Sequence, residues 1–148
     1  CPDARNIVLC ENLNFLKTPR IARDNHIELW YVGGNNISNI DYIPDHKLTL
    51  PLYYSCDWDY DGLKIYERLQ DRFARKSKSI TLLYPSPILR KSVESPEHNS
   101  RWKHDQPFSG LIRSAYSQEA ISLIQDLIAQ DEWVEEETCE LIEMVKLT

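Results

Sequence analysis

The stretch LTLPLYYSCDWDYDG (residues 48–62) joins an extended apolar run to a series of alternating carboxylates that ends at a glycine. Its first part, Leu48–Cys56, predicts a buried strand, with Pro51 tolerated near the start. The segment that follows, residues 62–76, has apolar side chains at helical spacing opposite a charged stripe. A strand that leads directly into an amphipathic helix is typical of α/β proteins.

The remaining apolar segments continue an alternation of strands and helices. Strands are expected at Asn6–Cys10, Ile27–Val32 and Ile80–Tyr84, helical turns at Asn36–Ile43, and helices at Leu13–Asp24, Ser117–Gln130 and Glu135–Leu147. This alternation implies right-handed crossovers and a mostly parallel sheet covered by helices. We therefore predict an α/β, Rossmann-like fold with a four-stranded sheet in residues 6–84 and C-terminal helices in residues 117–147. The polar stretch 85–112 is predicted to be a long loop.

Length and composition are those of one globular domain spanning residues 1–148, of which 42% are hydrophobic and 27% charged. The sequence begins with Cys1 rather than methionine, so we expect it to be the C-terminal part of a longer protein. It has no run of eighteen apolar residues and no signal-peptide pattern, so a cytoplasmic protein without a membrane partner is expected. The four cysteines and four histidines lack metal-site spacings, and each histidine is expected at the surface or in a loop.

The net charge of −6 is distributed unevenly along the chain. Residues 117–148 contain nine acidic side chains and one basic side chain, whereas residues 1–116 contain sixteen basic and fourteen acidic ones. Basic side chains gather in residues 62–78 and in the polar loop. Such a face is either solvated or in contact with phosphate groups, and the sequence leaves both readings open.

Acidic side chains follow the first and third predicted strands. Glu11 comes directly after the first strand, and Asp57 and Asp59 come after the third. Ligands of open α/β sheets gather beyond the carboxyl ends of strands, so these carboxylates are expected to converge if the two strands are neighbours. Clustered carboxylates stay ionised together mainly around a hard cation, and Mg²⁺ suits this set best.

Other acidic motifs fit this stretch less well. A calcium-binding EF-hand loop needs an apolar eighth residue and a glutamate twelfth, where this sequence has Lys64 and Arg68. A phosphatase of the D-x-D-G-T type needs glycine at the position of Tyr60. A structural reading stays open, in which Asp57 caps a helix and Asp59 pairs with a nearby basic side chain. Trp58 is expected to pack under the loop.

Three motifs together resemble a TOPRIM domain: a glutamate that closes the first strand (IVLCEN, residues 7–12), a Gly-Gly after the second (WYVGG, residues 30–34), and D-x-D after the third (CDWDYDG, residues 56–62). The last motif is similar to the D-x-D-P-x-G form in topoisomerase VI A subunits, with Tyr60 in place of the proline. With the late WVEEE (residues 133–137), the chain resembles the C-terminal nuclease domains of JetD subunits of Wadjet plasmid- and phage-defence systems.

The resemblance implies a magnesium-dependent DNA endonuclease, with Mn²⁺ able to substitute. Asp57 and Asp59 would hold the metal, and Glu11 would complete the site or act as general acid or base; Asp61 would be a further oxygen donor or a helix N-terminal charge. Double-stranded DNA and the SMC-like ATPase subunits of a defence complex are the implied partners, and a homodimer is compatible with them. Six basic residues are candidate nucleic-acid contacts: Lys64, Arg68, Arg90, Lys91, Arg101 and Lys103.

Two other classes of function remain open from the sequence. The domain could be a non-catalytic assembly or DNA-binding module that uses its acidic C-terminal part to hold partners. It could also be a topoisomerase-, primase- or RNA-processing-type TOPRIM enzyme. None of the eight tyrosines matches the attacking tyrosine of topoisomerases, so hydrolysis is favoured over transesterification.

Overall fold

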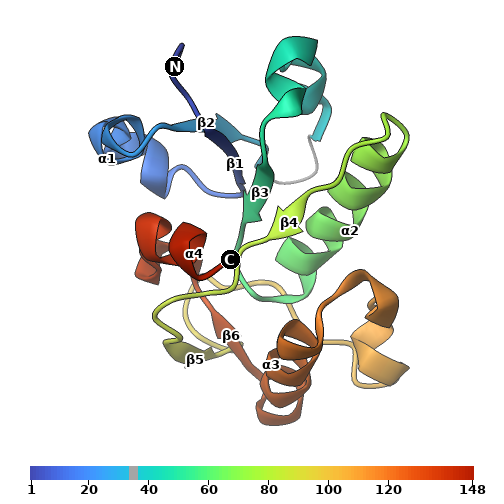
Figure 1. The fold of residues 1–148 in the computed structure, drawn as a ribbon. Helices are drawn as coiled ribbons and strands as arrows, with labels where there is room; N and C mark the ends of the chain where they lie inside the picture. Colours follow the sequence, from blue (N-terminus) through green and yellow to red (C-terminus); the bar gives the residue numbers. More distant parts are fainter. Residues whose placement is uncertain (34–36) are drawn as a thin grey trace.

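A computed structural model describes residues 1–33 and 37–148 (Figure 1). The fold is α/β, with a parallel four-stranded sheet in the order β2-β1-β3-β4 and a separate two-stranded antiparallel sheet of β5 and β6. The strands are β1 (Asn6–Cys10), β2 (Ile27–Tyr31), β3 (Leu52–Ser55), β4 (Thr81–Leu82), β5 (Arg90–Ser92) and β6 (Glu132–Val134). The α-helices are α1 (Pro19–Asp24), α2 (Tyr60–Ala74), α3 (Gln118–Gln130) and α4 (Leu141–Leu147). The predicted α/β class and parallel four-stranded sheet are confirmed.

The strand order creates a switch point between β1 and β3. From β1 the chain moves outward to β2, and it then crosses back to β3 on the other side of β1. Right-handed connections place the intervening helices on opposite faces of such a sheet, and Figure 1 shows α1 and α2 on opposite sides of it. The carboxyl ends of β1 and β3 therefore meet where Cys10 is aligned with Ser55.

The main helix forms where the sequence predicts it. Its apolar stripe faces the sheet, and Leu69 and Phe73 are completely buried. Asp59 begins the helix by accepting a hydrogen bond from the backbone N–H of Gly62, as an N-cap residue does. This cap explains why the helix follows the strand after so short a turn.

Several predicted elements are shorter in the structure. Pro51 lacks an N–H, and the predicted strand 48–56 is reduced to β3, preceded by a 3-10 helix at Asp45–Thr49. The predicted helix at residues 13–24 is divided at Pro19 into a 3-10 helix, Asn14–Lys17, and α1. The expected strand at 80–84 keeps only β4. The helical turns expected at 36–43 form as a 3-10 helix, Ile37–Tyr42; residue 36 and the second glycine of the WYVGG motif lie outside the described residues.

The C-terminal half differs more from the prediction. The stretch 85–112 is not a structureless loop, because β5 lies within it and pairs with β6. The predicted helix 135–147 is wrong in its first half, where a 3-10 helix, Glu136–Thr138, precedes α4. Asp131 adopts a left-handed conformation that ends α3, and the apolar Trp133 and Val134 then turn inward as a strand. Short apolar runs of this kind do not distinguish strand from helix.

This C-terminal half lies beyond the carboxyl ends of the parallel strands, at the lower side of Figure 1. The backbone of Trp58 pairs with that of Val134, through an N–H to carbonyl distance of 2.8 Å. Trp58 is buried, as expected, with its ring 5.6 Å from that of Tyr84. Among the described residues, no helix has the length and apolar character needed to cross a membrane.

Candidate functional site

Glu11 and Asp57 meet at the switch point, as predicted. The backbone N–H of Glu11 donates to the carbonyl of Ser55 over 3.0 Å, which extends the pairing of β1 and β3 by one residue. The backbone N–H of Asp57 in turn donates to Oε1 of Glu11 over 2.9 Å. The two residues, 46 positions apart in the sequence, are thus directly hydrogen-bonded.

Asn12 and Glu136 complete this acidic pocket, and sequence reasoning did not place either in the site. Oδ1 of Asp57 accepts hydrogen bonds from the side-chain amide of Asn12 at 3.2 Å and from the backbone N–H of Glu136 at 2.8 Å. The backbone N–H of Asn12 donates to Oε1 of Glu136 over 2.9 Å. We use the name acidic pocket for Glu11, Asp57 and Glu136. The signals for the two added residues were their places beside Glu11 and inside the WVEEE motif.

The carboxyl group of Glu136 has fewer hydrogen bonds than its burial would lead one to expect. It is only 1% exposed, and its Oε2 forms no hydrogen bond of full geometry within residues 1–33 and 37–148, although a hydrogen-bonding interaction with the Ser55 hydroxyl lowers the pKa of this carboxyl against the effect of burial. A buried carboxylate oxygen without a partner is costly, so native structures rarely keep one without a ligand or a functional role. Glu136 Oε2 and the Ser55 hydroxyl are the two buried side-chain atoms of the described residues that lack a hydrogen bond of full geometry.

The pocket raises the pKa of each of its carboxyl groups. Burial, together with the charges of Asp57 and Asp59, raises the pKa of Glu11 from 4.5 to about 9. Burial and the charge of Asp59 raise the pKa of Asp57 to about 6. Burial and the charge of Asp57 raise the pKa of Glu136 to about 8. Without a cation, the pocket therefore retains protons near neutral pH.

Asp59 lies beside the pocket, and both of its oxygens are already engaged. Oδ1 caps α2 through Gly62, and Oδ2 is 2.8 Å from Nε2 of His98. Asp61 is an exposed residue in the first turn of α2, where a negative charge interacts favourably with the helix dipole. Its backbone N–H donates to the hydroxyl of Ser100, which fastens the loop to the start of the helix.

The carboxylate oxygens of the site are of the kind that binds a hard cation. Their positions in this structure do not form a metal-binding group. Within the described part of the chain, no group of three or more His, Cys, Asp or Glu side chains is placed to hold a metal ion. The carboxylates accept from backbone and amide donors instead. Mg²⁺ in proteins commonly takes only one or two carboxylates and completes its shell with water and phosphate oxygens. The pocket offers three carboxylates, which is more than this minimum, and each of them has one oxygen that accepts from a backbone N–H.

Several of the candidate DNA contacts are paired with carboxylates of the described residues. Lys64 binds Glu67, Lys91 binds Glu135, and Arg90 lies within ion-pair distance of Asp126 and Glu132. Arg68 is exposed on α2. Such pairs leave less positive charge on the surface than the sequence indicates.

Arg101 and Lys103 are arranged differently. Arg101 donates to the backbone carbonyls of His98 and Ser100, both at 2.9 Å, and Lys103 lies over the ring of Tyr60 at 5.0 Å. The structure gives neither residue an acidic partner among the described side chains. Both are exposed on the loop that carries His98 to Asp59. They are the two basic residues best placed to meet a polyanion beside the pocket.

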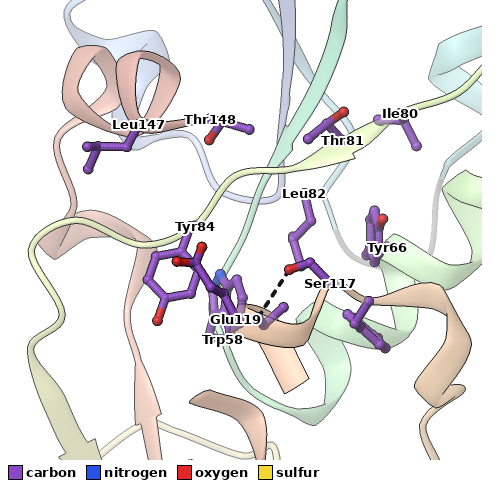
Figure 2. Close-up of a pocket in the computed structure, with 12 residues that line it drawn as sticks. Trp58, Tyr66, Ile80, Thr81, Leu82, Tyr84, Ser117, Glu119, Leu147 and Thr148 are labelled. Atoms are coloured by element: carbon purple, nitrogen blue, oxygen red, sulfur yellow. Dashed lines mark hydrogen bonds between the residues drawn. The ribbon is translucent and has the colours of Figure 1, made fainter. Parts of the chain in front are cut away.

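A separate cavity lies around Trp58 (Figure 2). It has a volume of about 340 Å³, and Trp58, Tyr84 and Glu119 line one end of it. Successive side chains of an extended segment point to opposite sides, so Trp58 points away from its two aspartate neighbours. None of the three carboxylates of the acidic pocket is among the lining residues of this cavity.

Comparison with known proteins adds no assignment: no protein-family model, no curated protein and no solved structure matches the chain.

Proposed function

We propose that the protein is a magnesium-dependent DNA endonuclease with a TOPRIM-like fold. The observation that carries this proposal is the meeting of Glu11 and Asp57 at the switch point, beside the buried carboxyl group of Glu136. The sheet order and the resemblance of the three motifs support the fold assignment. Parallel sheets bind their ligands at this place.

Glu11, Asp57 and Glu136 would hold the cation, with Asp59 beside them as the second aspartate of the motif. When bound, Mg²⁺ supplies polarisation of the phosphodiester and stabilises the negative charge that grows in the transition state. Mn²⁺ takes the same oxygen ligands and is expected to substitute. Burial, together with mutual repulsion, raises the carboxyl pKa values, and a bound cation would favour the ionised forms, so binding is coupled to proton release.

The other parts of the site would hold the nucleic acid. Arg101 and Lys103 attract the phosphate backbone, and their fixed positions against loop carbonyls and the Tyr60 ring orient it. Asn12 holds Asp57 through its amide and Glu136 through its backbone N–H, and it therefore fixes the spacing of two carboxylates. We place this activity in a larger plasmid-defence assembly with an SMC-like ATPase, on the strength of the resemblance to JetD subunits.

Cleavage of supercoiled plasmid in the presence of Mg²⁺ or Mn²⁺ tests this proposal. Asp57→Asn is expected to abolish cleavage, because it removes a charge from the pocket while keeping an acceptor for Asn12. The matched control is Asp24→Asn, which alters an exposed aspartate that pairs with Arg20. Metal-dependent cleavage that persists in Asp57→Asn would contradict the proposal.

One observation favours a second function, that of a non-catalytic assembly or DNA-binding module. The carboxylates of the pocket are hydrogen-bonded largely to donors of the chain itself, as expected for a site that serves folding. In that case Asp57→Asn would lower stability without affecting any metal-dependent activity. Binding of DNA without cleavage by the wild type would favour this second function.

A further inference from the structure

His98 connects the long loop to the acidic pocket. Its Nε2 is 2.8 Å from Oδ2 of Asp59, and its Nδ1 is 2.8 Å from the backbone carbonyl of Val93. Because a carbonyl oxygen only accepts, Nδ1 donates to Val93, and Nε2 shares a proton with Asp59. The imidazole is thereby held at both ends.

The ring of His98 is also held on its face. It stacks on Trp133 with ring centroids 3.8 Å apart and planes 14° from parallel. Trp133 donates its own indole N–H to the carbonyl of Ser92 over 3.1 Å, which fixes the ring that His98 contacts. The side chains of His98 and Asp59 are each only 6% exposed. Two hydrogen bonds and one stacking contact therefore fix the position of this buried imidazole.

Asp59 connects His98 to the start of α2, beside the acidic pocket. One of its oxygens caps α2 and the other meets His98, so its carboxylate cannot rotate toward the pocket without breaking one of these bonds. Asp59 is two residues from Asp57, and Trp58 between them is fixed by its backbone pairing with Val134. The strand β6 that carries Val134 and Trp133 leads directly to Glu136.

We propose that His98 is a positioning residue, which acts through Asp59 and Trp133 to set the distance between Asp57 and Glu136. This inference rests on the proposed function, since it assigns His98 to the cation site. Asp59 then serves as the link between His98 and the start of α2. Asp57, Glu11 and Glu136 carry the direct contacts to the cation.

The test is Mn²⁺ affinity, measured by titration calorimetry on the full chain at one pH. His98→Ala removes both hydrogen bonds and the stacking, and the loss of a partner of this kind typically weakens metal binding about 10-fold to 100-fold. His98→Gln places an amide N–H near the position of Nε2 and is expected to recover most of the affinity. Thermal unfolding and near-ultraviolet circular dichroism establish that each variant is folded.

His104→Ala is the matched control. His104 forms a pair of the same kind with Asp131, at 2.7 Å, but on the exposed side of the loop. Its removal is expected to leave Mn²⁺ affinity unchanged. If His104→Ala lowered the Mn²⁺ affinity as much as His98→Ala does, the loss would come from a general disturbance of the loop. That result would overturn the inference.

The outcomes separate this inference from the proposed function. Weaker Mn²⁺ binding in folded His98→Ala, with recovery in His98→Gln, supports the role of His98. Equal affinities in the wild type and His98→Ala overturn that role alone. Absence of Mn²⁺ binding in the wild type overturns the proposed function and the role of His98 with it.

Discussion

Glu11 Oε1 accepts a hydrogen bond of 2.9 Å from the backbone N–H of Asp57, and this bond joins the ends of two neighbouring parallel strands. It forms because β1 and β3 are adjacent and in register up to Cys10 and Ser55. The chain leaves these strands in opposite directions, and the start of the 3-10 helix Glu136–Thr138 contacts the point where they end. The bond is therefore at the place where an α/β sheet presents its ligands.

Glu136→Gln is expected to abolish metal-dependent cleavage without unfolding the protein. The amide keeps an oxygen that can accept from Asn12, but it removes the negative charge from the buried position. The control is Glu137→Gln, which alters the exposed neighbour in the same motif. Plasmid cleavage assays compare the two variants, and full activity in Glu136→Gln would show that Glu136 is not needed for catalysis.

The free energy of unfolding is expected to fall as pH rises in the absence of divalent cations. The folded pKa values of Glu11, Glu136 and Asp57 are about 9, 8 and 6, above their ordinary values near 4. Groups with raised folded pKa values stabilise the fold fully only below their unfolded pKa, and this contribution is lost as pH rises through the folded pKa. His98 acts in the same direction, because its hydrogen bonds to Asp59 and Val93 raise its pKa despite burial.

Urea unfolding at pH 5, 7 and 9 with a chelator measures this effect. Added Mg²⁺ or Mn²⁺ is expected to reduce the loss at high pH, because a bound cation stabilises the ionised carboxylates. A stability that increases steadily from pH 5 to pH 9 without cations would be inconsistent with a carboxylate cluster that retains protons.

Asp59→Ala is expected to lower the free energy of unfolding by about 1–3 kcal/mol, through loss of an N-cap and of a buried hydrogen bond to His98. Asp61→Ala, in the exposed first turn of the same helix, is expected to cost less than about 1 kcal/mol. Chemical denaturation at one pH compares the two. Equal effects would mean that the cap and the His98 contact contribute little to stability.

Replacing Arg101 and Lys103 together by alanine is expected to weaken DNA binding and to reduce the salt dependence of the affinity by about two phosphate contacts. The matched double variant replaces Arg90 and Lys91, which are already paired with carboxylates. Its effect is expected to be smaller. Fluorescence anisotropy across a salt series measures both, and the reverse order would indicate that DNA crosses the β5 side of the molecule.

The sequence predicted an element correctly where its local apolar pattern matches the face that the fold buries. Asn6–Cys10 is apolar throughout and forms β1 with the predicted bounds, and the apolar stripe of α2 is buried as its spacing indicates. The approach of Glu11 to Asp57 was expected only on the condition that their strands are neighbours, and the pairing of β1 with β3 meets that condition. These features depend on short-range periodicity and on the general handedness of α/β folds.

The parts that the sequence did not predict depend on contacts between distant residues. The pairing of β5 with β6 joins residues about forty positions apart, and neither strand has a clear alternating pattern. His98 gave no spacing signal, because its partners Asp59 and Trp133 come from different elements. Glu136 was one of three consecutive glutamates, and only the fold distinguishes the buried one from its neighbours.

Cation binding at pH 7.5 by titration calorimetry is the most direct test of the central claim. The wild type is expected to bind Mn²⁺ and Mg²⁺, and Asp57→Asn and Glu11→Gln are each expected to lose at least tenfold in affinity, or about 1.4 kcal/mol. Asp24→Asn is expected to bind as the wild type does. Wild-type affinity in both pocket variants, or no binding in the wild type, would contradict the assignment of a cation site to Glu11, Asp57 and Glu136.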